Sequence, residues 1–193
     1  MYLKSDKTTK LAIAALMAAM CYIGFQFLRF DIPVGPEKTA IHFGNAFCVL
    51  AALLLGGTWG GAAGAVGMTI ADLTSGYATS APKTFVLKLC IGLIVGLVAH
   101  RIAKIDEHHE TSYVAKWTVI ASICGMAFNV VADPIVGYFY KKFLFGLDTG
   151  LAAALAKMAA VSTFVNAITS VAIASVVYLA LRPALKKAKL NVH

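Results

Sequence analysis

The stretch HFGNAFCVLAALLLGGTWGGAAGAVGMTIADLTSGYATSAPKTFVLKLCIGLIVGL, residues 42–97, decides the fold class of this chain. It consists of long apolar runs that are interrupted once, by the polar connection IADLTSGYATSAPKTFVLK at residues 70–88. This connection brings Asp72, Tyr77, Lys83 and Lys88 together within 19 residues. A membrane span does not need them, and a charge that enters the bilayer is costly. The polarity of residues 70–88 must therefore serve another purpose.

The composition of the whole chain agrees with the apolar runs. Of its 193 residues, 60% are hydrophobic and only 13% are charged, whereas a soluble domain carries about 25% charged residues. Continuous apolar runs predict an all-α integral membrane protein, because helices satisfy their own backbone hydrogen bonds in hydrocarbon. The net charge of +8 comes mainly from Lys and Arg at the ends of the runs, where they meet lipid headgroups. We therefore expect membrane lipid, and no nucleic acid, as a partner.

The apolar runs predict a single domain over residues 1–193 that forms a six-helix bundle. The predicted spans are 9–28, 41–55, 58–73, 83–103, 113–139 and 151–181. The second and third are shorter than the roughly 20 residues that cross a bilayer, so five or seven crossings are the alternatives. Pro33, Gly35 and Pro36 predict an irregular loop after the first span. The larger share of Lys and Arg falls on the side of the chain ends, which predicts cytoplasmic N- and C-termini.

A set of polar residues is expected at membrane depth, in the outer half of the bundle. A structural ion pair such as Asp72 with Lys88 is one interpretation. The other is a hydrated pocket that binds a small polar solute, with Phe30, Phe43 and Phe128 nearby to stack on a flat ring. We favour the pocket, because residues from several spans converge there. Its candidate residues are His42, Asn45, Asp72, Tyr77, Lys83, Lys88, Asn129, Asp133, Tyr138 and Asn166.

Motifs of common enzymes are missing from the sequence. It contains no HExxH, GxSxG or Walker A pattern. The run DEHHE at residues 106–110 is expected to be a solvated turn, and the four cysteines are isolated in apolar runs. We therefore predict no catalytic residues, no metal site and no cofactor. Without a nucleotide site, active transport would draw its energy from a partner or from an ion gradient.

Small residues form two faces that allow helices to approach closely. Ala14 and Ala18 share one helix face, Ala15 and Ala19 share another, and the predicted third span carries a GxxxG pattern at residues 60–64. These faces could pack within the chain or serve as a docking surface for another membrane subunit. For the first span we favour docking.

Together these features resemble the substrate-binding S component of an energy-coupling factor (ECF) vitamin transporter. The resemblance covers nearly the whole chain, and its most specific part is residues 42–97, which are similar to S components of the hydroxymethylpyrimidine, pyridoxine and riboflavin branch. The alanine pairs of the first span match the family's AxxxA docking motif. The resemblance implies capture of a vitamin at the prokaryotic cell membrane, without ATPase activity of its own. It also implies a shared transmembrane coupling subunit and two cytoplasmic ATPases as partners.

The vitamin itself does not follow from the scaffold. Asp72 and Asp133 are expected to offset Lys83 and Lys88, which favours a neutral or zwitterionic heteroaromatic ligand, pyridoxine or hydroxymethylpyrimidine. Pantothenate comes next, because its carboxylate could meet a lysine, and then riboflavin. Three other classes stay open: a solitary proton-coupled carrier, an intramembrane enzyme that uses Asp72, Asp133 and His42, and a purely structural subunit.

Overall fold

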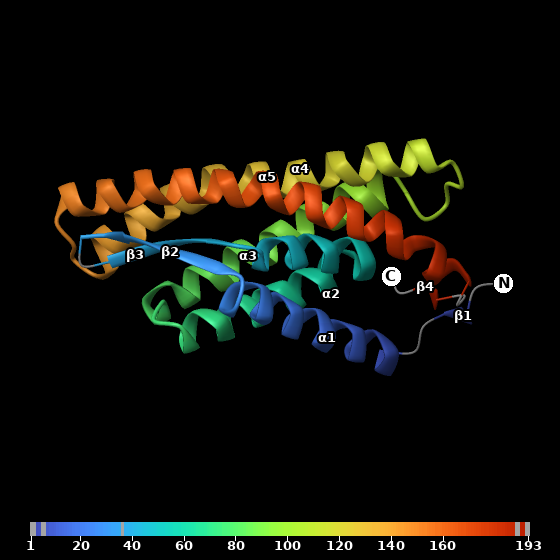
Figure 1. Ribbon diagram of the computed structural model, residues 1–193, viewed down its shortest axis with the longest axis horizontal. Helices are drawn as coiled ribbons and strands as arrows, with labels where there is room; N and C mark the ends of the chain where they lie inside the picture. The colour runs from blue at the N-terminus through green and yellow to red at the C-terminus, as the bar shows by residue number, and fades with distance from the viewer. Residues whose placement is uncertain (1–2, 5–6, 36, 188–189, 192–193) are drawn as a thin grey trace.

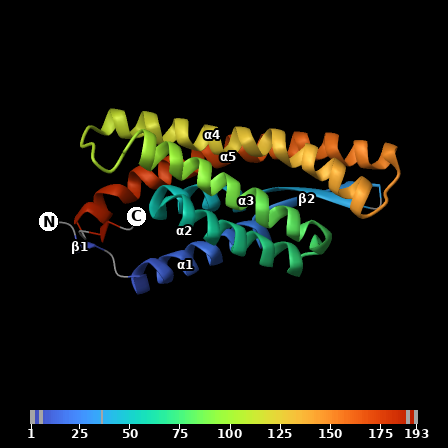
Figure 2. The same ribbon diagram turned by 180° about the vertical axis from the view of Figure 1, so that it is seen from behind.

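The computed structural model describes residues 3–4, 7–35, 37–187 and 190–191. Long helices dominate it (Figure 1). They are α1 (Lys7–Gln26), α2 (Gly44–Thr74), α3 (Ala81–Gly96), α4 (Thr111–Phe139) and α5 (Thr149–Lys187). The π-helical turns Leu97–Ile102 and Tyr140–Leu144 extend α3 and α4, and a 3₁₀ turn, Ala78–Ser80, precedes α3. Viewed from behind, α1, α2 and α3 form one layer and the α4–α5 pair forms the other (Figure 2).

Five of the described helices are long and apolar enough to cross a membrane. Their ranges are Lys7–Gln26, Gly44–Thr74, Ala78–Ile102, Thr111–Leu144 and Thr149–Leu185. The predicted all-α membrane protein is thus confirmed at the level of a multi-helix, multi-pass fold. The count of six crossings and the side on which the termini lie stay predictions.

Helix α2 is built from two helical arms, residues 44–55 and 57–74, that meet at a non-helical residue. Gly56 has φ 79° and ψ 174°, a conformation that glycine adopts without a Cβ clash. The arms fold back on each other, since a Cβ on Gly60 would overlap the backbone of Ala51 and Ala52, and one on Gly64 would lie 3.0 Å from Cys48 Sγ. The GxxxG pattern at residues 60–64 therefore packs within the chain.

Glycines also bring the second arm of α2 against α3. Gly57 and Gly61 face Gly96 and Gly92, so two GxxxG patterns meet, and a Cβ on Gly61 would lie 2.9 Å from the carbonyl oxygen of Leu89. Backbones that approach this closely gain van der Waals contact, which is what holds helices together in lipid. The packing places Lys83, Thr84 and Lys88 of α3 beside the end of α2 that carries Asp72.

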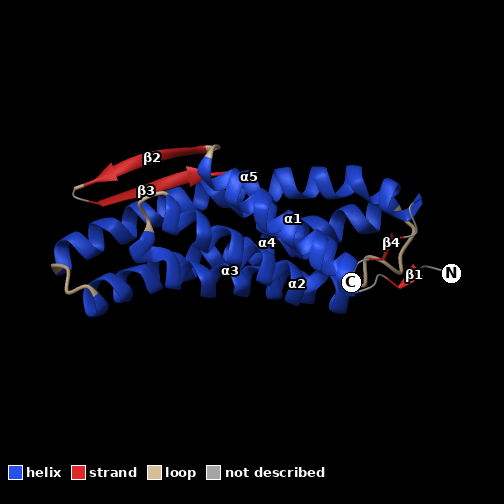
Figure 3. Cartoon of the chain, turned by 90° about the horizontal axis from the view of Figure 1, so that it is seen from below, coloured by secondary structure: helices blue, strands red, loops and turns tan. Residues whose placement is uncertain are grey.

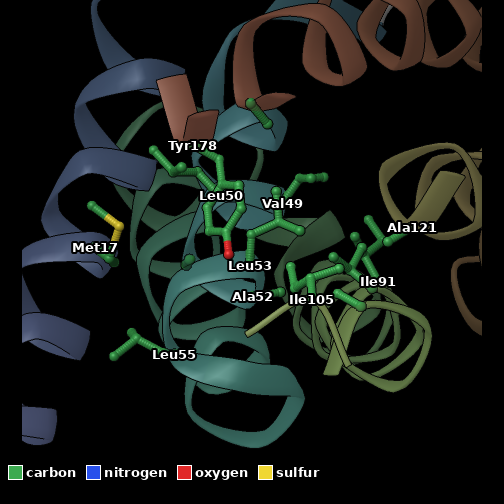
Figure 4. Packing of buried hydrophobic residues seen from close by; sticks show 14 of the residues in the cluster. Met17, Val49, Leu50, Ala52, Leu53, Leu55, Ile91, Ile105, Ala121 and Tyr178 are labelled. Carbon is green, nitrogen blue, oxygen red and sulfur yellow. The ribbon is translucent and has the colours of Figure 1, made fainter. Parts of the chain in front are cut away.

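The buried core gathers side chains from all five helices (Figure 4). Met17 of α1, Leu53 of α2 and Ile91 of α3 lie in the same cluster as Ala121 of α4 and Tyr178 of α5. Ile105, from the connection between α3 and α4, is also fully buried in it. The core thus fixes the five helices relative to one another.

The loop predicted after the first span is a β-hairpin. Strand β2 (Arg29–Val34) pairs antiparallel with β3 (Glu37–His42), with Arg29 opposite His42 and Val34 opposite Glu37. Gly35 supplies the positive φ of the turn, at 60°, and Pro33 lies within β2, where an edge strand tolerates it. The prediction of an irregular loop was wrong. Arg29, Asp31 and Pro33 alternate with apolar residues, as in a β-strand, and Pro33 does not prevent the strand from forming.

The hairpin lies at the end of the bundle opposite to the start of α1 and the end of α5 (Figure 1). It runs alongside one end of α5 (Figure 3), against which β3 packs. At the other end, β1 (Leu3–Lys4) pairs parallel with β4 (Leu190–Asn191). As a result His42 belongs to a strand rather than to the predicted second helix, while Asn45 lies in the first turn of α2.

Candidate substrate cavity

A polar cavity of about 110 Å³ lies between the β2–β3 hairpin and the helices at that end of the bundle. Side chains from α1, α2, α3, α4, α5 and β3 line it. The predicted residues that the structure brings together here are His42, Asn45, Asp72, Tyr77, Lys83, Lys88, Asn129, Asp133 and Asn166. The convergence of side chains expected from the sequence is therefore present in the fold.

Tyr138 is the predicted site residue that lies outside this lining. Its hydroxyl accepts a long hydrogen bond from Lys142 (3.4 Å), and its ring packs edge-on against Phe139. Asn129 and Asp133 are four residues apart and share a face of α4, and the next residue on that face is Gly137. A Cβ on Gly137 would lie 3.3 Å from Lys83 Nζ. Tyr138 is one position further and points away.

An ion pair joins α3 to α4 across the cavity. Lys83 Nζ lies 2.8 Å from Asp133 Oδ1, and the two side chains are only 11% and 18% exposed. Thr163 of α5 donates a hydrogen bond of 3.0 Å to the other oxygen, Asp133 Oδ2. Three helices are therefore connected through one carboxylate. The charge of Lys83 is balanced before any ligand enters.

The predicted structural pair of Asp72 with Lys88 is not seen among the described residues. Asp72 Oδ2 instead accepts a 2.5 Å hydrogen bond from the hydroxyl of Thr84. Among the described residues, Asp72 forms no ion pair within 4.0 Å. Lys88 lies one helical turn after Thr84 on the same face of α3 and is 6% exposed. The cavity thus holds an acid and a base that do not touch each other.

Several buried polar atoms of the cavity have no hydrogen-bond partner in the described part of the chain. They are Nδ1 of His42, Oδ1 of Asn45 and Oδ1 of Asn129. Both asparagines are only 1% exposed. Leaving a buried polar group unsatisfied costs about 1–3 kcal/mol, and native proteins rarely do so without a reason. A bound molecule that offers N–H or O–H groups would satisfy these atoms.

The hairpin is held over the cavity by hydrogen bonds to α5. The backbone N–H of His42 donates to Asn166 Oδ1 (2.8 Å), and Asn166 Nδ2 donates to the carbonyl of Ala40 (3.1 Å). Thr39 and Ser162 join their hydroxyls at 2.9 Å. A single side chain of α5, Asn166, therefore satisfies two backbone groups of β3 and fixes the strand in place.

Charged groups tie the hairpin to the loop after α2. Asp31 accepts hydrogen bonds from Tyr77 and Lys38 and forms an ion pair with Arg29, each at 3.0 Å. Partial burial alone would raise the pKa of Asp31, but these contacts outweigh it and hold the pKa below its ordinary value. Burial, followed by the hydrogen bond to Asp31, raises the pKa of Tyr77. Burial, together with the positive charge of Lys88, lowers the pKa of His42 to about 3, so its imidazole is neutral at pH 7.

Other cavity residues were missed from the sequence. Phe25 is one of them, and its ring centroid lies 5.6 Å from that of Tyr77, which was predicted. Phe30, one of the expected aromatics, is instead 71% exposed on the hairpin. The missed polar residues are Lys38, Thr39, Ser80, Thr84, Lys141, Ser162 and Thr163. One signal was available, since Ser162, Thr163 and Asn166 cluster on one side of an otherwise apolar helix.

The alanines predicted for docking divide between two faces of α1. Ala14 is buried, and the backbone of Ala18 lies directly against Gly67 of α2. Ala15 and Ala19 are exposed, next to the exposed Leu16. Ala14 and Ala18 therefore pack within the chain, and of the two predicted pairs only Ala15 and Ala19 are accessible to another subunit.

The remaining clusters of reactive side chains show no metal geometry. Among the described residues, no group of three or more His, Cys, Asp or Glu is placed to hold a metal ion. In the connection between α3 and α4, His100 hydrogen-bonds Asp106 at 2.6 Å, and Arg182 donates to the carbonyls of Ile105 and His108. Cys21 and Cys48, expected to be isolated, bring their Sγ atoms within 3.7 Å as free thiols.

Comparison with known proteins connects this architecture to a family. A model of the family "ECF-type riboflavin transporter, S component" matches residues 5–183. The chain belongs to this family of S components. Comparisons with curated proteins and with solved structures each give no match. The family consists of substrate-binding subunits of vitamin transporters, not enzymes, which work with a shared membrane subunit and ATPases. The polar cavity of this S component is thus its candidate substrate site.

Proposed function

We propose that this S component captures a small water-soluble vitamin or vitamin precursor in its polar cavity and delivers it to an ECF transporter. The observation that carries the proposal is the set of unsatisfied buried groups: Lys88 and the acceptor atoms of His42, Asn45 and Asn129 converge on one cavity. Native proteins rarely leave buried polar groups unsatisfied without a reason, and here four of them face the same cavity. A ligand that hydrogen-bonds them accounts for all four.

The size of the cavity supports a compact ligand. Its volume of about 110 Å³ is well below the 300–1,000 Å³ or so of sites for drug-sized molecules. Pyridoxine and hydroxymethylpyrimidine, which have one ring, suit this space better than the three-ring system of riboflavin, the ligand in the family's name. Phe25 and Tyr77 provide aromatic surfaces on which one ring can pack. Pantothenate remains the alternative without a ring.

We further propose that the chain crosses the membrane six times with both termini in the cytoplasm of a prokaryote. The reversal at Gly56 supports six crossings, because it divides α2 into two antiparallel arms. The distribution of Lys and Arg supports the orientation. In this arrangement the hairpin and the cavity face outward, where a nutrient arrives, and the β1–β4 end faces the cytoplasm.

Energy for uptake would come from partners. The sequence contains no Walker A pattern, so we propose that a transmembrane coupling subunit and two cytoplasmic ATPases drive release. Ala15 and Ala19, exposed on α1, form the proposed contact with the coupling subunit, since small residues let helices approach closely in lipid. The proposed docking face therefore consists of Ala15 and Ala19, without Ala14 and Ala18.

Transport in reconstituted vesicles tests the proposal against its main rival, a solitary proton-coupled carrier. We expect vesicles that contain only this chain to bind radiolabelled pyridoxine, hydroxymethylpyrimidine or pantothenate without accumulating it. Adding the coupling subunit, the ATPases and ATP should start accumulation. Accumulation by the chain alone under a proton gradient would instead identify a solitary carrier.

A further inference from the structure

The polar cavity contains two lysines on neighbouring turns of α3 whose surroundings differ. Lys83 lies 2.8 Å from Asp133. Lys88 has no carboxylate within 4.0 Å in the described part of the chain and no hydrogen bond is seen to its ammonium group. Yet Lys88 is the more deeply buried residue, at 6% exposure. The structure therefore keeps one ammonium group of the cavity without a direct partner.

The carboxylates that line the cavity are already engaged by other residues. Asp133 is held by Lys83 and Thr163, and Asp72 is held by Thr84. A buried charge is stable only when it is paired or hydrogen-bonded. For Lys88 the missing partner must come from outside the protein, and the open space beside it is the cavity. A neutral carbonyl would accept a hydrogen bond from the ammonium group but leave its charge unbalanced, whereas an anionic oxygen accepts the hydrogen bond and also balances the charge.

We propose that Lys88 binds an acidic oxygen of the ligand, a carboxylate or a phenolate, while the ligand's N–H or O–H groups satisfy the open acceptors of His42, Asn45 and Asn129. This inference rests on the proposed function and specifies the class of its substrate. Pyridoxine carries an acidic phenol and a basic ring nitrogen, and pantothenate carries a carboxylate together with hydroxyl and amide donors. Hydroxymethylpyrimidine carries no acidic oxygen. The sequence had favoured it because the two aspartates were expected to offset both lysines, but among the described residues the ion pair within 4.0 Å that joins these four groups is that of Asp133 with Lys83.

Acetate and its neutral isostere acetamide test the assignment without requiring the natural substrate. The measurement is the Tm of the purified protein in detergent, titrated with each probe at constant ionic strength. We expect acetate, and not acetamide, to raise the Tm of the unmodified protein along a saturable curve. In Lys88→Met and Lys88→Gln the apparent Kd for acetate should rise roughly tenfold or more, as expected when a charge-assisted hydrogen bond is lost.

Lys142→Met is the matched control, because it removes an ammonium group near the same end of the bundle but outside the cavity lining, and leaves both Lys83 and Lys88 in place. Its acetate response should persist. Equal responses to acetate and acetamide, or an acetate response that survives in both Lys88 variants, would overturn the proposal. Failure of the vitamins to bind while acetate still depends on Lys88 would instead contradict the proposed function and leave the role of Lys88 standing.

Discussion

Breaking the Lys83–Asp133 ion pair should destabilise the empty protein strongly. The pair is 2.8 Å long, and its side chains are 11% and 18% exposed, so solvent screens it little. Lys83→Met would leave Asp133 with the hydroxyl of Thr163 as its described contact. Removing one partner of a buried pair costs about 3–5 kcal/mol. For a chain of this length that corresponds to a fall in Tm of roughly 6 °C or more.

A double-mutant cycle separates the interaction energy of the ion pair from the contributions of each side chain's other contacts. Asp133→Leu alone would leave Lys83 buried without its partner, and it should cost a similar amount. Lys83→Met combined with Asp133→Leu removes both charges, and it should recover most of the lost stability because an apolar pair can replace a buried ion pair at little cost. The assay is thermal unfolding in detergent of all four proteins. Additive losses in the double variant would refute the reasoning, because they would show that the two charges stabilise the fold independently.

Three further predictions concern the hairpin, its pH dependence and the docking face. Asn166→Ala removes both hydrogen bonds to β3. Bound ligand should therefore dissociate about tenfold faster or more in stopped-flow measurements. An unchanged rate would mean that the hairpin does not cover the ligand. Burial lowers the pKa of His42 from 6.5 to about 3, so between these values the unfolded chain binds a proton that the folded protein does not. Stability should therefore fall as the pH drops below 6.5, by up to about 1.4 kcal/mol per pH unit, and unfolding curves of His42→Gln should lack this contribution. Ala15→Trp should abolish ATP-driven uptake but preserve ligand binding. Ala14→Trp, at a buried position, should instead lower the Tm. Loss of ligand binding in Ala15→Trp would argue against a docking role.

The helical membrane fold and most of the cavity residues were predictable because the bilayer imposes simple rules. Long apolar runs must be helices in lipid, and polar residues within them must converge or pair. The spacing of Asn129 and Asp133 places both on one face of α4, and the structure has them there. The Gly56–Gly57 boundary between two predicted spans coincides with the break in α2. Tyr138 lies outside the cavity lining because a residue one position away on a helix faces a different direction.

Features that depend on tertiary contacts were not predictable. No local signal shows that Asp133 forms its ion pair with Lys83 rather than Lys88, since both distances depend on how α3 packs against α4. The same holds for Ser162 and Thr163, which become cavity residues only because β3 crosses that side of α5. The inward position of Ala14 likewise follows from the close approach of α1 to Gly67 of α2. Sequence spacing alone left both alanine pairs equivalent.

Calorimetric titration of the purified chain in detergent tests the central claim most directly. The ligands are pyridoxine, hydroxymethylpyrimidine, pantothenate and riboflavin, added separately without partner subunits or ATP. We expect one compact vitamin with an acidic oxygen, pyridoxine or pantothenate, to bind tightly at a single site. Asn129→Ala should weaken this binding by about 1–3 kcal/mol. Absence of heat from all four ligands would contradict the proposed vitamin capture. Tight binding of riboflavin would contradict the size and charge that the polar cavity is proposed to select.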